Sequence, residues 1–127
     1  MLHVATEWGV IEAVPVTIRL LKVQHKPMAF YEEAEYRRLV EGGAKADDRA
    51  HVAVLLGGEA GLRRGEMTAL EWRDIDFGRR LLHVHRAEWE GQIGTPKGGR
   101  SRTIEMSSAL TAALKAHRHL KGQRVLI

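Results

Sequence analysis

The chain has 127 residues, enough for one domain with a buried core, and 44% of them are hydrophobic, as in ordinary globular proteins. The absence of cysteine excludes disulfides and thiolate metal sites, and no apolar run is long enough to span a bilayer. Because the N-terminus also lacks the pattern of a signal peptide, we expect a soluble, cytoplasmic protein.

The net charge of +4 is unevenly distributed along the chain. Residues 1–62 carry seven Lys or Arg and nine Asp or Glu, a net charge of −2, whereas residues 63–127 carry thirteen and seven, a net charge of +6. Such an asymmetry is a weak indication of a polyanionic partner. On charge alone, an ordinary well-solvated surface is the favoured explanation.

The first part of the chain predicts the end of a helix followed by a linker. Residues 1–14 carry a short apolar pattern that is broken by Gly9. The stretch 15–29 contains Pro15 and Pro27 and interleaves basic with apolar residues, which is typical of a linker.

Two helices are predicted next. Phe30–Val40 has an apolar face and acidic residues toward its N-terminal end, and we expect Gly42-Gly43 to end this helix. Asp47 or Asp48 is suited to cap a second helix, which we expect to end at Gly61.

The second half of the chain predicts a small antiparallel sheet. A short helix at Glu66–Leu70 precedes an alternating strand at Trp72–Phe77 and a second strand at Leu81–Ala87. Glu90–Gly94 reads as a flexible connection, and Arg100–Met106 as the third strand. The predicted fold class is therefore α+β, mainly helical with a three-stranded antiparallel sheet.

A final helix is predicted after the third strand. Ser107 or Ser108 caps it, and Gly122 ends it. Its apolar face consists of Leu110, Ala113, Leu114 and His117. We expect the apolar residues Val125–Ile127 to be exposed, and this surface motivates a possible homo-oligomer or a protein-binding role.

Arg63 and Arg64 lie at a turn bounded by Gly61 and Gly65, which we expect to let the backbone bend without a Cβ penalty. A guanidinium held on such a turn is suited to bind a phosphate through paired hydrogen bonds. A single arginine beside a glycine is nevertheless most often just a solvated side chain.

Two sequence motifs make phosphate binding by Arg63 the better interpretation, because both resemble conserved motifs of one protein family. The first is Gly61-Leu62-Arg63-Arg64-Gly65-Glu66 with Ala69-Leu70-Glu71-Trp72-Arg73-Asp74-Ile75-Asp76. The second is Thr95-Pro96-Lys97-Gly98-Gly99-Arg100-Ser101-Arg102-Thr103-Ile104. In this order and spacing they resemble the tyrosine recombinases, the phage integrase family, and the likeness runs over nearly the whole chain.

The resemblance implies roles for three residues in breaking and rejoining DNA. Arg63 would contact the non-bridging oxygens of the scissile phosphate, where negative charge accumulates during attack. Lys97, on a hairpin entering the minor groove, would help to protonate the leaving 5′-oxygen. Glu66 would orient Arg63 or brace the turn, although an exposed first-turn carboxylate is an equally good reading.

The same resemblance implies double-stranded DNA as the partner. Arg64, Arg100 and Arg102 would be further DNA contacts beside Arg63 and Lys97. No metal and no cofactor is expected: His83 and His85 share a face of a strand, but no carboxylate or cysteine is spaced to complete a metal site.

Other parts of the family pattern have no match. The family also needs a His-x-x-Arg box on a helix and a tyrosine nucleophile that forms a 3′-phosphotyrosine. His83-Val84-His85-Arg86 has the right spacing but falls on a predicted strand, and Tyr31 and Tyr36 precede Arg63. We therefore expect residues 1–14 to be the tail of a core-binding domain, 15–29 the linker, and 30–127 the N-terminal part of an integrase catalytic domain, inactive by itself. The alternatives are a non-catalytic DNA-binding module and a protein-interaction domain.

Overall fold

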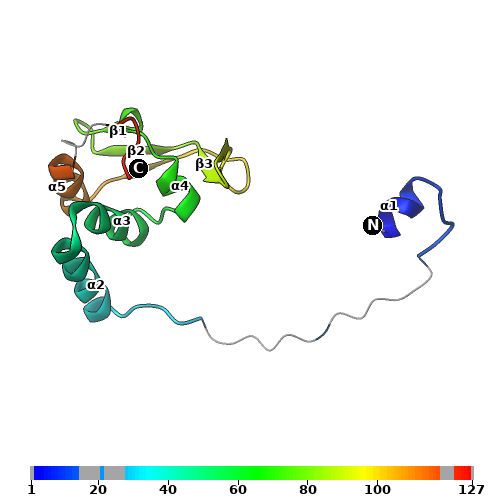
Figure 1. Cartoon of the computed structure of the whole chain (residues 1–127), viewed down its shortest axis with the longest axis horizontal. Coiled ribbons are helices and arrows are strands. Elements are labelled where there is room, and N and C mark those ends of the chain that lie inside the picture. The colour runs from blue at the N-terminus through cyan, green and yellow to red at the C-terminus, as the bar shows by residue number, and fades with distance from the viewer. Residues whose placement is uncertain (1, 15–20, 22–27, 118–121, 127) are drawn as a thin grey trace. The chain divides into compact units, whose positions relative to one another are not determined.

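The computed structural model describes residues 2–14, 21, 28–117 and 122–126 (Figure 1). The chain forms two compact units, residues 1–30 and 31–127. The first contains the helix α1 (Leu2–Glu7), followed by turns, as predicted. Most of the predicted linker 15–29 lies outside the described residues, so the proposed domain boundaries stay predictions. In the described part, no helix has both the length and the apolarity that crossing a membrane would need.

The second unit combines helices with two small sheets. Its helices are α2 (Glu33–Ala46), α3 (Asp48–Gly58), α4 (Arg64–Thr68), a short 3-10 helix η1 (Trp72–Asp74) and α5 (Ser108–His117). The strands β1 (Ile75–Asp76), β2 (Leu81–Val84) and β5 (Arg102–Glu105) form an antiparallel sheet in the order β1-β2-β5. The strands β3 (Ala87–Trp89) and β4 (Gln92–Gly94) form a separate hairpin. In the view of Figure 1, α2, α3 and α4 lie below the strands.

The core lies where α3 and α5 pack together and meet β2. Its centre consists of fully buried leucines at positions 55, 56, 82, 110 and 114. Burial of each such side chain contributes about 1.5–3 kcal/mol. The face predicted for the last helix is confirmed, since Leu110, Ala113, Leu114 and His117 are all buried. Ser107 caps this helix by accepting the Leu110 N–H at 3.0 Å.

The first two helices of this unit meet at a sharp corner. Asp47 has an extended backbone and caps α3 by accepting the Ala50 N–H at 2.7 Å, as predicted. The expectation that Gly42-Gly43 ends α2 is wrong, because the helix continues to Ala46. Gly43 is buried, and a Cβ there would lie 3.3 Å from the Cα of His51. This glycine therefore allows α2 and α3 to approach closely instead of ending a helix. The expected end of α3 at Gly61 also needs correction, because the helix stops at Gly58.

The predicted sheet exists, but its strands are shorter than expected. The stretch Trp72–Phe77 begins as the 3-10 helix, because Asp74 accepts the Glu71 N–H at 2.9 Å and tightens the chain into a turn. The expected strand Leu81–Ala87 leaves the sheet after Val84. Glu90–Gly94 is not a flexible connection: Glu90 and Gly91 both have positive φ, as in the two-residue turn that closes a tight hairpin.

The C-terminal segment is packed into the core, contrary to expectation. Val125 is only 3% exposed, and its N–H donates to the Leu70 carbonyl at 2.9 Å. The Trp72 N–H donates to the Gln123 carbonyl at 3.1 Å, and His117 Nε2 lies 2.8 Å from the Val125 carbonyl oxygen. Val125 is therefore unavailable as the exposed apolar surface that motivated a homo-oligomer or a protein-binding role. Ile127 lies outside the described residues.

At position 65 a glycine is needed because another part of the backbone comes very close to it. The unusual backbone bend that we expected there is absent, since Gly65 has no positive φ. It lies inside α4, where an added Cβ would come 2.5 Å from the Glu88 carbonyl oxygen of β3. A backbone atom at that distance has to move away, so the helix and the hairpin would separate.

We predict that Gly65→Ala lowers the free energy of unfolding by about 1–3 kcal/mol, as overpacking does. Gly42→Ala is the matched control, since Gly42 is helical and a Cβ there meets nothing within 4 Å. The control should gain about 0.5–1 kcal/mol from helix propensity. Urea unfolding of the three proteins checks this, and equal stabilities for both variants would contradict the close contact.

Candidate DNA phosphate site

The turn that carries the two arginines is built by one glycine and one glutamate. Gly61 has a φ of +61°, a conformation that residues with a Cβ rarely adopt, and it redirects the chain between α3 and α4. The Arg63 N–H then donates to Glu66 Oε2 at 2.9 Å, while the Glu66 N–H donates to the Arg63 carbonyl at 2.9 Å. These reciprocal bonds satisfy backbone groups at the start of α4 and place the Arg63 side chain at its N-terminus.

Glu66 is buried, with only 2% of the residue exposed, and its charge is compensated by two arginines. Arg102 of β5 makes a bidentate ion pair with it, through hydrogen bonds of 2.9 and 2.8 Å. Arg63 Nη1 lies 3.4 Å from Glu66 Oε1, while the Arg63 side chain stays largely exposed. The hydrogen bond from Arg102, together with the Arg63 backbone N–H and both positive charges, outweighs burial and lowers the pKa of Glu66 to about 2. The same pair raises the pKa of Arg102.

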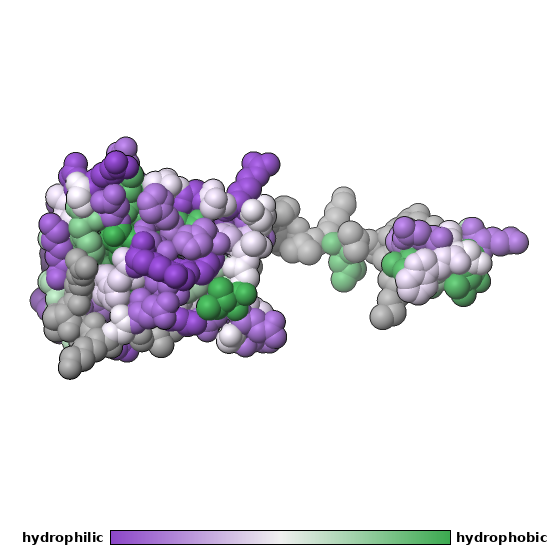
Figure 2. All heavy atoms as spheres, turned by 90° about the horizontal axis from the view of Figure 1, so that it is seen from above, coloured by the Kyte–Doolittle hydropathy of each residue, from purple (hydrophilic) through white to green (hydrophobic). Residues whose placement is uncertain are grey.

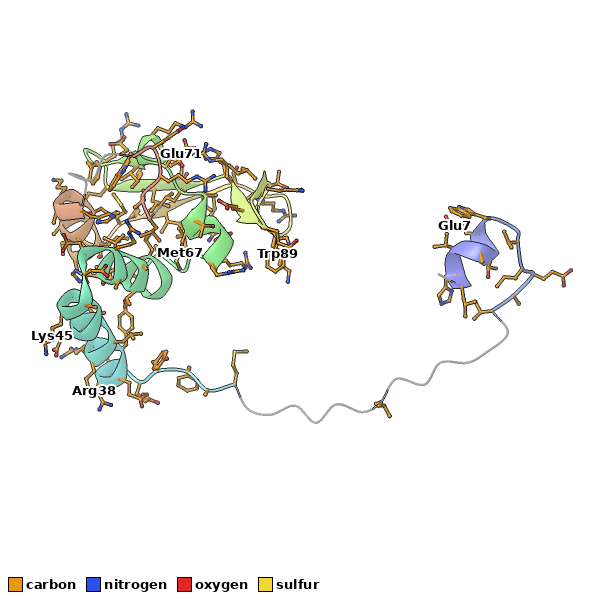
Figure 3. The ribbon with its side chains drawn as sticks, viewed as in Figure 1. Glu7, Arg38, Lys45, Met67, Glu71 and Trp89 are labelled. Carbon is orange, nitrogen blue, oxygen red and sulfur yellow. The ribbon has the colours of Figure 1, made fainter. Side chains whose placement is uncertain are left out.

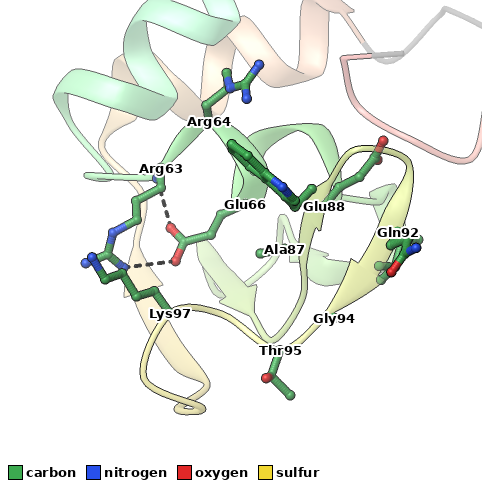
Figure 4. Close-up of a pocket in the computed structure, with 12 residues that line it drawn as sticks. Arg63, Arg64, Glu66, Ala87, Glu88, Gln92, Gly94, Thr95 and Lys97 are labelled. Carbon is green, nitrogen blue, oxygen red and sulfur yellow. Dashed lines mark hydrogen bonds and ion pairs between the residues drawn. The ribbon is translucent and has the colours of Figure 1, made fainter. Parts of the chain in front are cut away.

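A cavity of about 610 Å³ lies beside this turn and brings the two sequence motifs together. Arg63, Arg64 and Glu66 line it from the first motif, and Lys97 lines it from the second. Figure 4 shows Arg63, Glu66 and Lys97 on one side of the cavity, with Glu88 and Gln92 of the hairpin on the other. The exposed guanidinium of Arg63 and the exposed ammonium of Lys97 are therefore donors to a single space.

Lys97 lies in a tight turn formed by Pro96–Gly99, here called the Lys97 loop. The Gly99 N–H donates to the Pro96 carbonyl at 2.8 Å, and Gly98 and Gly99 both have positive φ. Pro96 is buried, so the loop is anchored directly before Lys97. Arg102, where β5 begins, anchors its other end through Glu66.

The remaining predicted DNA contacts are placed differently. Arg64 lines the cavity, with its Cζ 5.7 Å from the centre of the Trp89 ring. Arg100 is exposed and is not among the residues that line the cavity. Arg102 makes its bidentate ion pair with Glu66, and its side chain remains 35% exposed.

The rejected candidates lie outside this cavity. Tyr31 is exposed, and Tyr36 is half-buried against Gly58. His83 Nδ1 lies 3.0 Å from Thr103 Oγ1, and among the described residues no group of three His, Cys, Asp or Glu could hold a metal ion. Arg86, from the four-residue pattern His83–Arg86, pairs with Asp74 and Glu71 in the fold.

Sequence reasoning missed the hairpin wall of the cavity. Trp89 and Ile93 line it, and both are exposed apolar residues. The signal was present, because the three residues on each side of Glu90-Gly91 fit a strand, and a glycine in such a turn is typical of a hairpin.

Comparison with known proteins shows which family the chain belongs to. The family model described as the phage integrase family matches residues 29–124. The chain belongs to this family. It is also 30% identical over 110 residues to a tyrosine recombinase XerC-like protein of Caldanaerobacter subterraneus subsp. tengcongensis. That alignment covers 76% of this chain and 28% of the relative, so the chain spans less than a third of the relative's length.

Solved integrase and recombinase structures share the fold. The Tn1549 transposon integrase, in complex with a circular intermediate DNA, matches with a TM-score of 0.77 and 20% identity, over 94% of this chain and 41% of that one. XerA recombinase matches with a TM-score of 0.59 and 23% identity, over 74% of this chain and 30% of that one. The resemblance inferred from the two motifs and the α+β fold class are both confirmed.

The lowered pKa of Glu66 predicts acid sensitivity. Because the folded pKa lies below the ordinary value of 4.5, ionised Glu66 stabilises the fold fully above about pH 4.5, and this contribution disappears as the pH falls toward 2. The shift corresponds to about 3 kcal/mol of unfolding free energy. Urea unfolding between pH 3 and pH 7 should therefore show a weaker pH dependence for Glu66→Gln than for the parent chain.

The matched control is Glu33→Gln, because the Glu33 side chain is exposed and pairs only with exposed Arg37 among the described residues. This change should leave the pH dependence as it is, since an exposed ion pair contributes little. A parent chain and a Glu66→Gln variant with the same pH profile would contradict the role given to this carboxylate.

Proposed function

We propose that this chain is part of the catalytic domain of a site-specific DNA recombinase, and that the cavity beside α4 binds the scissile phosphate of double-stranded DNA. The observation that carries the proposal is that Arg63 and Lys97, from two separate motifs, line one cavity. A phosphodiester presents anionic oxygens to a guanidinium and a leaving oxygen to a general acid, and this cavity offers both groups.

In the proposed reaction, the phenolate of a tyrosine from outside this chain attacks the phosphorus, a 3′-phosphotyrosine forms, and the bond to the 5′-oxygen breaks. Arg63 stabilises the charge that gathers on the non-bridging oxygens, because its donors are already in place before the attack. Lys97 gives a proton to the leaving 5′-oxygen, so that a neutral hydroxyl departs. Glu66 holds Arg63 at the turn, and Arg102 acts through Glu66 as a positioning residue.

We expect the chain to bind a short DNA duplex with an affinity that falls steeply with salt, because phosphate contacts release counterions. Arg63→Ala and Lys97→Ala should each weaken binding about tenfold, the usual loss for a hydrogen bond to a charged group. Each should also reduce the slope of log affinity against log salt by about 1. A gel-shift titration at several salt concentrations measures both quantities.

Arg38→Ala and Lys45→Ala are the matched controls. Both residues lie on α2, are exposed and do not line the cavity (Figure 3). Control variants that weaken binding as much as the cavity variants would mean a diffuse electrostatic attraction. A parent chain that ignores DNA at low salt would overturn the proposed function.

The 127-residue chain by itself should form no covalent DNA adduct. It contains two tyrosines, Tyr31 and Tyr36, and neither lines the cavity. Incubation with a nicked suicide substrate and denaturing electrophoresis tests this. A phosphotyrosine adduct that survives denaturation and disappears in Tyr31→Phe or Tyr36→Phe would contradict the assignment of the nucleophile to a residue outside this chain.

A further inference from the structure

The hairpin wall of the cavity, formed by Trp89 and Ile93, has properties that phosphate binding does not explain. Trp89 is 66% exposed and Ile93 50% exposed, yet both line the same cavity as Arg63 and Lys97. Large apolar side chains exposed together beside charged groups often mark a binding surface. On the face shown in Figure 2, the exterior of this unit is mostly hydrophilic, with separate apolar areas.

The Trp89 ring lies next to the guanidinium of Arg64. Arg64 Cζ lies 5.7 Å from the ring centre, a distance at which a guanidinium is attracted to an aromatic face. Such a contact occupies one side of the ring and leaves the exposed remainder available to another group. In Figure 3, Trp89 lies at the hairpin end of the unit.

The strand that carries Trp89 is anchored, so the ring has a defined position. The residue directly before it, Glu88, forms an ion pair with Arg124, and its carbonyl lies against Gly65 of α4. A rigid aromatic side chain loses little conformational entropy when it binds a partner, which makes an anchored Trp suitable for recognition.

We propose that Trp89 and Ile93 bind the nucleoside next to the phosphate that Arg63 contacts. A nucleotide consists of an anionic phosphate joined to a sugar and a flat base. The cavity has cations, Arg63 and Lys97, that suit the phosphate, and an apolar aromatic wall that suits the sugar and base. Its volume of about 610 Å³ is within the range of small-molecule sites and leaves room for more than a phosphate. This inference rests on the proposed function and adds a second contact surface to it.

The test is a fluorescence-anisotropy titration of a short labelled duplex with one nick. Trp89→Ala should weaken binding about tenfold, since stacking of one base on an aromatic side chain contributes about 1–3 kcal/mol. The salt slope should stay unchanged, because no phosphate contact is lost. Trp89→Phe should retain most of the affinity, since it keeps an aromatic face.

Trp8→Ala is the matched control, because Trp8 is 76% exposed and belongs to the other unit. It should bind as the parent chain does. Urea unfolding of Trp89→Ala should show unchanged stability, so that any loss of affinity is not a folding defect. Replacing the nucleoside beside the nick by an abasic analogue separates base from sugar: the effect of Trp89→Ala disappears if the ring stacks on the base and persists if it packs on the sugar.

The outcomes separate this inference from the function on which it rests. DNA binding that weakens in Arg63→Ala but is unchanged in Trp89→Ala would overturn the nucleoside contact alone. A parent chain without affinity for DNA would overturn both. A loss in Trp89→Ala that also lowers the salt slope by about 1 would mean that the ring acts only by holding Arg64, and this too would overturn the proposal.

Discussion

The buried carboxylate of Glu66 is the group on which the arrangement of this unit depends. A buried charge without partners costs several kcal/mol, so the fold is stable only with Glu66 paired. One partner, Arg63, is local, whereas the other, Arg102, comes from β5. Pairing both therefore brings the helix α4 and the strand β5 together. It also joins the two motifs, because the Lys97 loop ends where β5 begins.

A second set of contacts holds the opposite wall of the cavity in place. The hairpin β3–β4 meets α4 at Gly65, where helix and strand backbones approach too closely for a side chain. Arg124 fastens the same hairpin through Glu88, and Val125 beside it is buried in the core. Arg86, which completes the pattern His83–Arg86, forms ion pairs with Asp74 and Glu71 and is mostly buried. Its role is therefore to hold the fold together. The cavity thus lies between two anchored walls.

The sequence predicted the features that depend on local chemistry. Helix caps at Asp47 and Ser107 and the buried face of α5 follow from residues close together in the chain, and the three-stranded sheet was predicted from the alternating pattern of its strands. Some errors were local, such as the missed β3–β4 hairpin, and the others arose where segments distant in sequence meet. Gly43 and Gly65 looked like breaks or bends, but each permits a close approach by another segment. Val125 looked exposed because its partner, Leu70, lies far away in sequence. The two site motifs were found from resemblance, whereas their common cavity and the Trp89 wall required the structure.

The low pKa of Glu66 has a consequence for how such a site responds to its surroundings. Because this carboxylate remains ionised far below neutral pH, and both partners are guanidinium groups, the triad of Glu66, Arg63 and Arg102 keeps a net charge of +1 throughout the physiological range. The net charge of the groups that hold the Arg63 turn in place therefore does not change with pH in this range. If the proposed DNA binding changes near neutral pH, the proton responsible has to bind to a group outside this triad, so pH can separate the proposed phosphate contact of Arg63 from other steps.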